Sequence, residues 1–249
     1  MKKLVKIISW LFAAGSILLV AGVFYIYAVI MPELPSIEHL EDTQYQVPLR
    51  IYDRNEVLLD EFGEHRRIPV KFEKIPRHLI NAIVAVEDDQ YWNHYGIDPY
   101  ALMAAVYEVL TTGRKTRGGS TITMQVARNF FLSPEQTYTR KFNEMLLALK
   151  IESELSKDKI LELYLNKIFL GHRSYGISAA SQVYYDKKLD ELTLAQSAMI
   201  AGLPKAPSKY NPITNPERAL IRRNYILSRM RILKYISEEE FNLARTEPV

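Results

Sequence analysis

Residues 87–96 read Glu-Asp-Asp-Gln-Tyr-Trp-Asn-His-Tyr-Gly, an acidic cluster followed by aromatic side chains, a histidine and a glycine. Upstream, apolar residues recur at three- and four-residue spacing, which predicts a helix over 77–92 with Glu87 on its apolar face. A carboxyl group among apolar neighbours, and next to Asp88 and Asp89, should have a raised pKa. A raised pKa suits a general base that works near neutral pH. An ordinary acidic helix end is the competing interpretation.

A second motif, residues 118–125, reads Gly-Gly-Ser-Thr-Ile-Thr-Met-Gln. The glycines permit a close backbone approach, and Ser120 or Thr121 can cap the helix predicted over 120–131. The start of a helix offers free N–H groups to an anion such as a phosphate. Three basic residues stand just upstream: Arg114, Lys115 and Arg117. Their charge favours anion binding over a plain capped helix.

A third motif, residues 140–144, reads Arg-Lys-Phe-Asn-Glu and lies in a helix predicted over 138–155. That helix is apolar around most of its circumference, so we expect it to be buried. A buried Glu144 needs a partner, and Arg140 lies one turn before it. A structural ion pair and a functional role are both compatible with this spacing. Three side chains together offer positive charge for a diphosphate: Arg128, Arg140 and Lys141.

The remaining pattern is helical almost throughout beyond Pro76. Further helices are predicted over 98–112, 157–169, 174–184, 193–203 and 216–234. Residues 47–72 alternate around turn signals at Asp53-Arg54-Asn55 and Gly63-Glu64, which predicts a small β-hairpin element. Taken alone, the helices at 157–166 and 222–227 are typical of scaffold. The sequence predicts a mainly α domain with a small β-hairpin element.

One predicted helix is unusual, because Tyr100 to Leu110 is apolar except for Glu108. This stretch is too short to span a bilayer. A buried core helix is the favoured interpretation. The alternative is a helix that dips into a membrane surface.

The N-terminal region predicts a membrane anchor, because no charged residue occurs from Ile7 to Met31, more than the roughly 20 residues needed to cross a bilayer. Lysines precede this span and acids follow it, so the positive-inside rule places the N-terminus in the cytoplasm. The span is too long for a cleaved signal peptide, and no A-x-A-like site follows it. Four parts are expected: a cytoplasmic tail (1–6), a transmembrane helix (7–31), a linker (32–46) and an exported domain (47–249).

The composition of the sequence excludes several classes of protein and of functional site. Of 249 residues, 48% are hydrophobic and 24% charged, which excludes a disordered chain. There are no cysteines, so disulfides, zinc–thiolate sites and thiol catalysis are excluded. His94 is interpreted as a structural hydrogen-bonding residue, because no second histidine stands at metal-ligand spacing. Three lysines of the tail carry the whole net charge of +3, which argues against a nucleic-acid partner.

These segments, in this order, resemble glycosyltransferase family 51, the peptidoglycan glycosyltransferases of class A penicillin-binding proteins and their monofunctional relatives. The family pattern E-D-x-x-F-x-x-H-x-G matches 87–96, with Tyr91 replacing the phenylalanine. The pattern G-G-S-T-I-T-Q-Q matches 118–125, with Met124 replacing the first glutamine. Arg128 stands where the family usually has lysine, and it keeps the charge.

Three further family patterns follow in order. R-K-x-x-E matches 140–144, K-x-x-I-L-E-x-Y-L-N is close to 157–166, and R-R-x-x-V-L is close to 222–227. The resemblance extends from about residue 50 to the end of the sequence. Five ordered motifs are far more specific than any one of them.

The resemblance implies a lysozyme-like helical domain that polymerises lipid II into β-1,4 glycan strands, with inversion at MurNAc C1 and release of undecaprenyl diphosphate. It implies that Glu87 is the general base for the acceptor's 4-hydroxyl group. It places Glu144 on the donor side near the diphosphate, with a divalent cation (Mg²⁺ or Mn²⁺) as a candidate companion and no organic cofactor. The positions it implies for substrate binding are Asp88, His94, Gly119, Ser120, Thr121, Gln125, Arg128, Arg140, Lys141 and Asn166.

The resemblance also implies partners and a location. The implied partners are lipid II, the growing glycan strand, the membrane and candidate cell-wall assembly proteins, with no nucleic acid. The implied location is the inner (cytoplasmic) membrane, crossed once, with the catalytic domain in the periplasm. Of the transpeptidase motifs of bifunctional relatives, only S-x-x-K occurs, at Ser156 to Lys159, and we regard it as a chance match. Residues 237–249 read like the point where bifunctional proteins continue, so an N-terminal portion of a 1A-type protein is expected, with a monofunctional enzyme as the alternative.

Two other function classes stay open from the sequence. A lytic or hydrolytic enzyme of the same fold class would release soluble fragments from finished cell wall. A non-catalytic, membrane-anchored scaffold for cell-wall assembly would tolerate loss of Glu87. The basic residues at 128, 140 and 141 favour a transferase over a hydrolase, because departure of a diphosphate needs positive charge whereas a hydrolase needs a protonated acid.

Overall fold

The computed structural model of the chain describes residues 2–41, 43, 45, 48–55, 58–63, 66–113, 118–133 and 137–249. It divides into two compact units, Met1–Ile37 and Glu38–Val249. The described residues are mostly helical with small sheets, so the prediction of a mainly α fold is confirmed.

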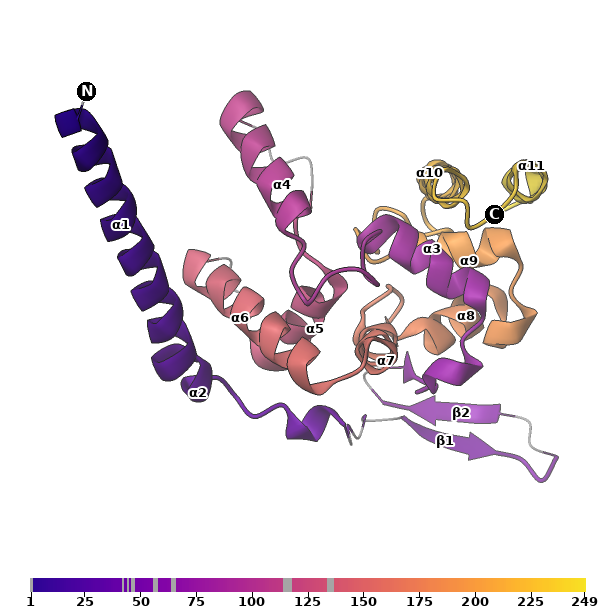
Figure 1. Cartoon of the computed structure of the whole chain (residues 1–249). Helices are drawn as coiled ribbons and strands as arrows, with labels where there is room; N and C mark the ends of the chain where they lie inside the picture. The colour runs from indigo at the N-terminus through magenta and orange to yellow at the C-terminus, as the bar shows by residue number, and fades with distance from the viewer. Residues whose placement is uncertain are drawn as a thin grey trace. The chain divides into compact units, whose positions relative to one another are not determined.

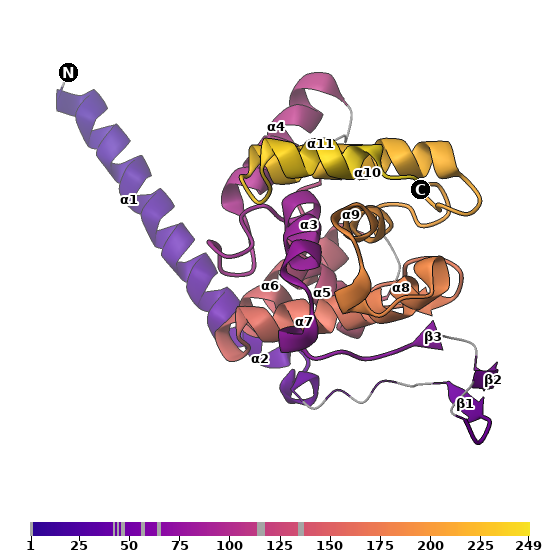
Figure 2. The same cartoon turned by 90° about the vertical axis from the view of Figure 1, so that its right-hand side faces the viewer.

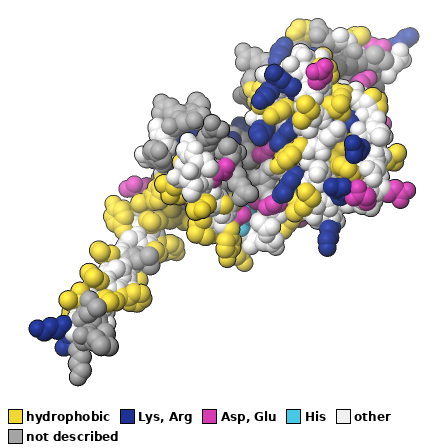
Figure 3. Space-filling model, turned by 90° about the horizontal axis from the view of Figure 1, so that it is seen from above, with side chains coloured by type: hydrophobic (Ala, Val, Ile, Leu, Met, Phe, Trp, Pro, Cys, Tyr) yellow, Lys and Arg dark blue, Asp and Glu magenta, His cyan; other side chains and the backbone are white. Residues whose placement is uncertain are grey.

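The first unit is a single helical run. It consists of α1 (Lys2–Tyr25), a π-helical turn (Ile26–Ile30) and α2 (Met31–Glu33). The segment Lys6–Glu33 is long and apolar enough to cross a membrane, in agreement with the predicted span. Apolar side chains cover its length in Figure 3, and basic side chains lie at its far end.

The second unit contains two groups of packed helices (Figures 1 and 2). The first group packs around α9 and comprises α3 (Arg77–Glu87), α9 (Leu194–Gly202), α10 (Pro216–Ile232) and α11 (Glu238–Thr246). The second group packs around α5 and comprises α5 (Ile122–Phe131), α6 (Tyr138–Glu154) and α7 (Lys157–Lys167). Helix α8 (Ile177–Tyr185) contacts both α7 and α9 and so connects the groups.

The predicted hairpin is present. Strands β1 (Leu49–Tyr52) and β2 (Leu58–Phe62) pair antiparallel, and the N–H of Asn55 donates to Asp53 Oδ1 at 2.8 Å in the turn between them. The second turn signal includes Glu64, which lies outside the described residues. Strand β3 (Arg66–Arg67) pairs in parallel with β4 (Ser174–Tyr175), which ties the hairpin region to the segment before α8.

Helix α3 ends at Glu87, five residues before the predicted end. Asp88 has an extended backbone (φ −166°, ψ 80°), and the chain then turns through residues 89–96. The spacing of apolar residues continues through this turn, so periodicity alone does not predict that the helix ends at Glu87. The stop comes from tertiary contacts of the Asp88 side chain, described below.

Two C-terminal elements also differ from the prediction. The helix predicted from 174 starts at Ile177, because Gly176 adopts φ +86° and residues 174–175 form β4. Helix α11 was not predicted, although Ser237 and Glu240 form a capping box at its start.

The core-helix interpretation of 100–110 is wrong. Helix α4 (Pro99–Thr112) has no buried residue, and Tyr100 and Leu110 are 81% and 79% exposed. In Figure 1 it projects from the packed helices of its unit. Hydropathy reports only that a helix avoids water, and it does not distinguish a protein core from a membrane.

We predict that Gly96→Ala destabilises the domain by about 2–5 kcal/mol. Gly96 has φ +83°, and an added Cβ would lie 2.6 Å from the carbonyl oxygen of Ala148 on α6. Thermal and urea unfolding of the detergent-solubilised chain measure the loss. Gly118→Ala is the control, because its Cβ would meet no described atom within 4 Å. Equal stability of the two variants would contradict the packing argument.

Candidate active site

A buried carboxylate joins the end of α3 to the start of α5. Asp88 Oδ2 accepts a hydrogen bond from the N–H of Ile122 at 2.9 Å, and both its carboxylate oxygens lie 3.0 Å from His94 Nε2. Asp88 and His94 are 8% exposed. Charge-assisted bonds to a buried acceptor are strong, so this junction determines how the two helix groups meet beside Glu87.

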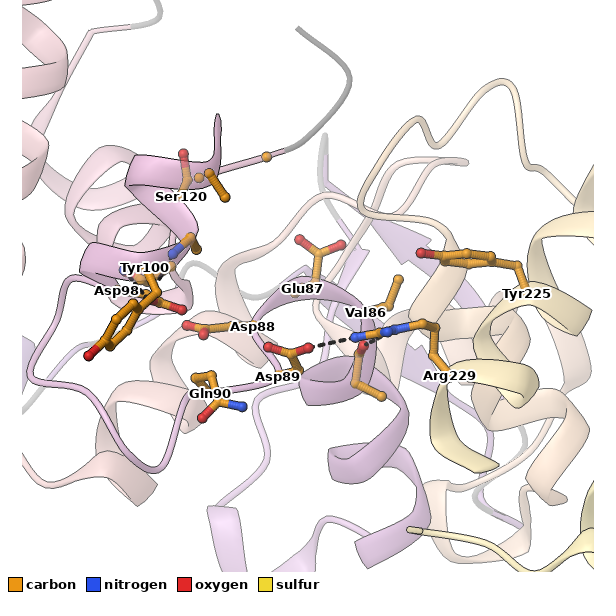
Figure 4. Close-up of a pocket in the computed structure, with 16 residues that line it drawn as sticks. Val86, Glu87, Asp88, Asp89, Gln90, Asp98, Tyr100, Ser120, Tyr225 and Arg229 are labelled. Carbon is orange, nitrogen blue, oxygen red and sulfur yellow. Dashed lines mark hydrogen bonds and ion pairs between the residues drawn. The ribbon is translucent and has the colours of Figure 1, made fainter. Parts of the chain in front are cut away.

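Glu87 faces a cavity of about 570 Å³. The cavity is formed by the end of α3, the start of α4, residues 118–121 and helix α10. In Figure 4 the Glu87 carboxylate points into the space between Ser120 and Tyr225, whereas Asp89 turns toward Arg229. Asp89 Oδ2 accepts from Arg229 Nη2 at 2.6 Å, which leaves Glu87 as the carboxylate directed into the centre of the drawn site.

Burial raises the pKa of Glu87 above its ordinary value of 4.5. Four influences act in the opposite direction: a hydrogen bond from Gln125 and the charges of Arg222, Arg128 and Lys205. The predicted direction of the shift is confirmed, and so is one of its two predicted causes, burial among apolar neighbours. The other predicted cause, crowding by aspartates, does not act, because Asp88 turns to α5 and Asp89 to Arg229.

Gln125 fixes the orientation of the Glu87 carboxylate. Its Nε2 donates to Glu87 Oε2 at 3.0 Å, while its Oε1 lies 3.5 Å from the hydroxyl of the fully buried Tyr164. Burial raises the pKa of Tyr164 well above its ordinary value, so this hydroxyl stays a donor. Gln125 also borders a second cavity, of about 350 Å³, which Arg128 and Lys167 line as well. Sequence reasoning missed Tyr164, which lies in a helix interpreted as scaffold.

Arg222 is a second missed residue, from a motif interpreted as scaffold. Its guanidinium lies over the rings of Tyr210 and Tyr225, 5.7 and 5.2 Å from their centroids, and the side chain is 8% exposed. Gly202 leaves room for it, because a Cβ there would lie 2.9 Å from Arg222 Cγ. Of the cations that lower the pKa of Glu87, Arg222 has the largest effect. A pair of arginines followed by an aromatic residue one turn later was the available signal.

The predicted ion pair of Glu144 is confirmed and extended. Glu144 is 1% exposed, and its two oxygens accept from Arg140 Nη1 and from Lys141 Nζ, the latter at 2.7 Å. Lys141 Nζ also lies 2.5 Å from Ser120 Oγ, and Ser120 lines the cavity of Glu87. Glu144 therefore holds two basic side chains against the rim of that cavity.

The start of α5 is capped as predicted, and of the two candidates it is Thr121 that forms the cap. Thr121 Oγ1 accepts from the N–H of Met124 at 3.1 Å, and Asp88 accepts from the N–H of Ile122. Two N–H groups of the first turn are thus used internally, so fewer are available to an anion than the sequence predicts. The upstream residues Arg114, Lys115 and Arg117 lie outside the described residues. Among the described residues, Lys141 brings positive charge to Ser120 at the edge of the cavity.

The structure places the other predicted site residues in two settings. Gly119, Ser120 and Thr121 line the Glu87 cavity, with Gly119 packed against α4. Asn166 is 2% exposed, and its amide exchanges two hydrogen bonds with the backbone of Val70 at 2.7 and 2.9 Å. It lines neither cavity described above, so we assign it a structural role.

Two of the three departures from the family pattern, Tyr91 and Met124, are accommodated in the interior. Tyr91 is fully buried, and its hydroxyl donates to the carbonyl oxygen of Lys157 at 2.5 Å. Met124 is 1% exposed and packs in the core, so its replacement of a glutamine removes no polar group from a cavity.

A divalent cation does not fit Glu144 as placed. Both of its carboxylate oxygens already accept from basic side chains. Within the described part of the chain, no three His, Asp or Glu side chains converge as a metal site. We therefore assign no catalytic step to a metal ion.

Comparison with known proteins adds a family assignment. Residues 55–231 match the Transglycosylase family. The chain is 53% identical to penicillin-binding protein 1A of Pseudomonas aeruginosa over 223 residues, covering 90% of this chain and 27% of that protein. It is 49% identical to penicillin-binding protein 1A of Escherichia coli over 238 residues, covering 95% of this chain and 28% of that protein. The crystal structure of penicillin-binding protein 1A from Haemophilus influenzae aligns with a TM-score of 0.49 at 36% identity, covering 83% of this chain and 21% of that one. The chain thus spans little more than a quarter of these curated relatives.

We predict that Asp88→Asn lowers the free energy of unfolding by about 1–3 kcal/mol, because a neutral amide replaces a buried charge that accepts from two donors. Asp89→Asn is the matched control. Asp89 forms a half-exposed pair with Arg229, so we expect a loss of at most about 1 kcal/mol. Urea unfolding at neutral pH measures both. A larger loss in Asp89→Asn would contradict the junction argument.

Proposed function

Because the chain belongs to the Transglycosylase family, we propose that it is a peptidoglycan glycosyltransferase that polymerises lipid II into β-1,4-linked glycan strands. The observation that carries this proposal is Glu87. Its carboxyl group faces a cavity of about 570 Å³, has a pKa raised by burial and is oriented by Gln125. Those are the properties of a general base that operates near neutral pH.

In the proposed reaction Glu87 takes the proton of the 4-hydroxyl group of the acceptor GlcNAc. The acceptor oxygen then attacks C1 of the donor MurNAc from the face opposite the leaving group. The bond between C1 and the diphosphate oxygen breaks, and undecaprenyl diphosphate leaves with the electron pair. Attack from the opposite face inverts the configuration at C1 from α to β.

The basic side chains opposite Glu87 support a charged leaving group. Negative charge develops on the diphosphate as its bond to C1 breaks, and fixed cations stabilise that charge. Lys141 and Arg140 are held by Glu144, and Lys141 reaches Ser120 at the cavity rim. Arg128 lines the second cavity, on the far side of Gln125. In this proposal Glu144 acts by positioning the two basic side chains.

A lipid-linked substrate also accounts for the apolar surfaces. We place the first unit in the inner membrane, with the N-terminus in the cytoplasm and the domain in the periplasm. Helix α4 exposes Tyr100, Met103, Tyr107 and Leu110 along one face, and in this proposal that face contacts the membrane surface. Enzyme and substrate are then confined to the same layer.

We predict that Glu87→Gln lowers lipid II polymerisation by at least about 100-fold, since the amide keeps the shape and the hydrogen bond from Gln125 but cannot accept the proton. Gel analysis of glycan chains made by the detergent-solubilised protein measures this. Glu154→Gln, an exposed glutamate on α6, is the control and should retain full activity.

Polymerisation by Glu87→Gln at the wild-type rate would refute the assignment of the base. If the folded wild type releases soluble fragments from purified cell wall and makes no polymer, a hydrolase is indicated instead. Absence of both activities would indicate a scaffold.

We predict that the acid limb of the pH–rate profile lies above pH 4.5, because activity falls as Glu87 becomes protonated and burial raises its pKa from that ordinary value. Arg222→Gln removes the cation that lowers the pKa of Glu87 most, so we expect that pKa to rise further. The acid limb of kcat/KM should therefore move to higher pH. Arg231→Gln on the same helix, whose arginine pairs with Glu238, should leave the limb in place. A limb that does not move in Arg222→Gln would remove Arg222 from the site.

A further inference from the structure

A third cavity lies beside the one that Glu87 faces. It has a volume of about 500 Å³ and is bounded by the turn after α3, the start of α4 and the outer face of α6. Its walls are chiefly apolar and are formed by Tyr95, Ile97, Pro99, Tyr100 and Leu149. A volume of this size is typical of a small-molecule site.

The polar side chains at its edge are largely engaged with the protein itself. Asn93 Nδ2 donates to Gln90 Oε1 at 3.1 Å, and His94 turns its Nε2 to Asp88. Asp98 caps α4 by accepting from the N–H groups of Tyr100 and Ala101 at 2.9 and 3.0 Å. The cavity therefore offers little to a charged or hydroxylated ligand, and an apolar one suits it.

This apolar cavity adjoins the polar one. Gln90, Asp98 and Tyr100 line both, and in Figure 4 the ring of Tyr100 points away from Glu87. A molecule with a polar head against Glu87 and an apolar tail can therefore occupy both cavities at once. The exposure of two apolar wall residues also favours an apolar ligand, since Tyr95 and Tyr100 are 82% and 81% exposed.

We propose that this third cavity binds the head-proximal isoprene units of a polyprenyl-linked substrate, while the sugar–diphosphate head occupies the cavity of Glu87. The proposal rests on the proposed function, because a lipid-linked sugar is the substrate it assigns. It adds a tail site that shares Tyr100 with the apolar face of α4 but otherwise lies outside that face, and it makes recognition of the lipid depend on the turn after α3 and on Leu149.

The test is equilibrium binding of two probes to the detergent-solubilised chain: undecaprenyl lipid II and the same head group on a single isoprene unit. Wild type should bind the undecaprenyl probe more tightly. Leu149→Gln puts a polar group into the cavity wall and should weaken binding of that probe about tenfold, with the single-isoprene probe changed by less than about threefold. Tyr95→Asn, at a highly exposed position, is the second variant in case Leu149→Gln unfolds.

Leu243→Gln, at an exposed leucine of α11, is the control for surface polarity and should bind like wild type. Leu110→Gln, on the apolar face of α4, separates the cavity from general contact with detergent or membrane. An equal loss in Leu110→Gln, or equal losses for both probes in Leu149→Gln, would overturn the proposal. Polymerisation is measured on the same preparations. Tight tail-dependent binding without polymer formation would refute the proposed function but would still support the tail site.

Discussion

The buried carboxylate of Asp88 is the interaction on which the rest of this site depends. It stops α3 one residue after Glu87, and it accepts the N–H of Ile122 at the start of α5. Because Gln125 lies three residues after Ile122, the same bond brings its amide within 3.0 Å of Glu87. His94 and Gly96 then fold the intervening turn back against α6. This junction and helix α8, which contacts both α7 and α9, together set how the two helix groups meet.

The two acidic residues discussed above, Glu87 and Glu144, differ in their surroundings. Burial raises the pKa of Glu87, and the charges of Arg222, Arg128 and Lys205 limit that rise, which favours the carboxylate form that the proposed base requires. Another buried acid, Glu144, is instead neutralised by Arg140 and Lys141. A buried ion pair contributes little net stability, so its use here is to hold basic groups in a defined place.

The apolar surfaces complement this polar centre. The first unit is apolar throughout its candidate span, α4 exposes an apolar face, and the third cavity has apolar walls that adjoin the polar one. A water-soluble substrate would not account for these three apolar surfaces. In the proposals above, an amphiphilic substrate would place its head and its tail in these adjoining cavities.

The sequence by itself determined the mainly α class, the apolar anchor, the hairpin, most helix positions and the ion pair of Glu144, because periodicity, turn residues and one-turn spacing are local properties. It did not determine where α3 stops, which N–H groups of α5 are free, or that α4 avoids the core. It also left Tyr164 and Arg222 in segments that read as scaffold. These features are decided by contacts between residues distant in the chain, such as Asp88 with Ile122 and Arg222 with Tyr210. Only the packed tertiary structure specifies which buried group meets which partner, and burial is what gives Glu87 its raised pKa.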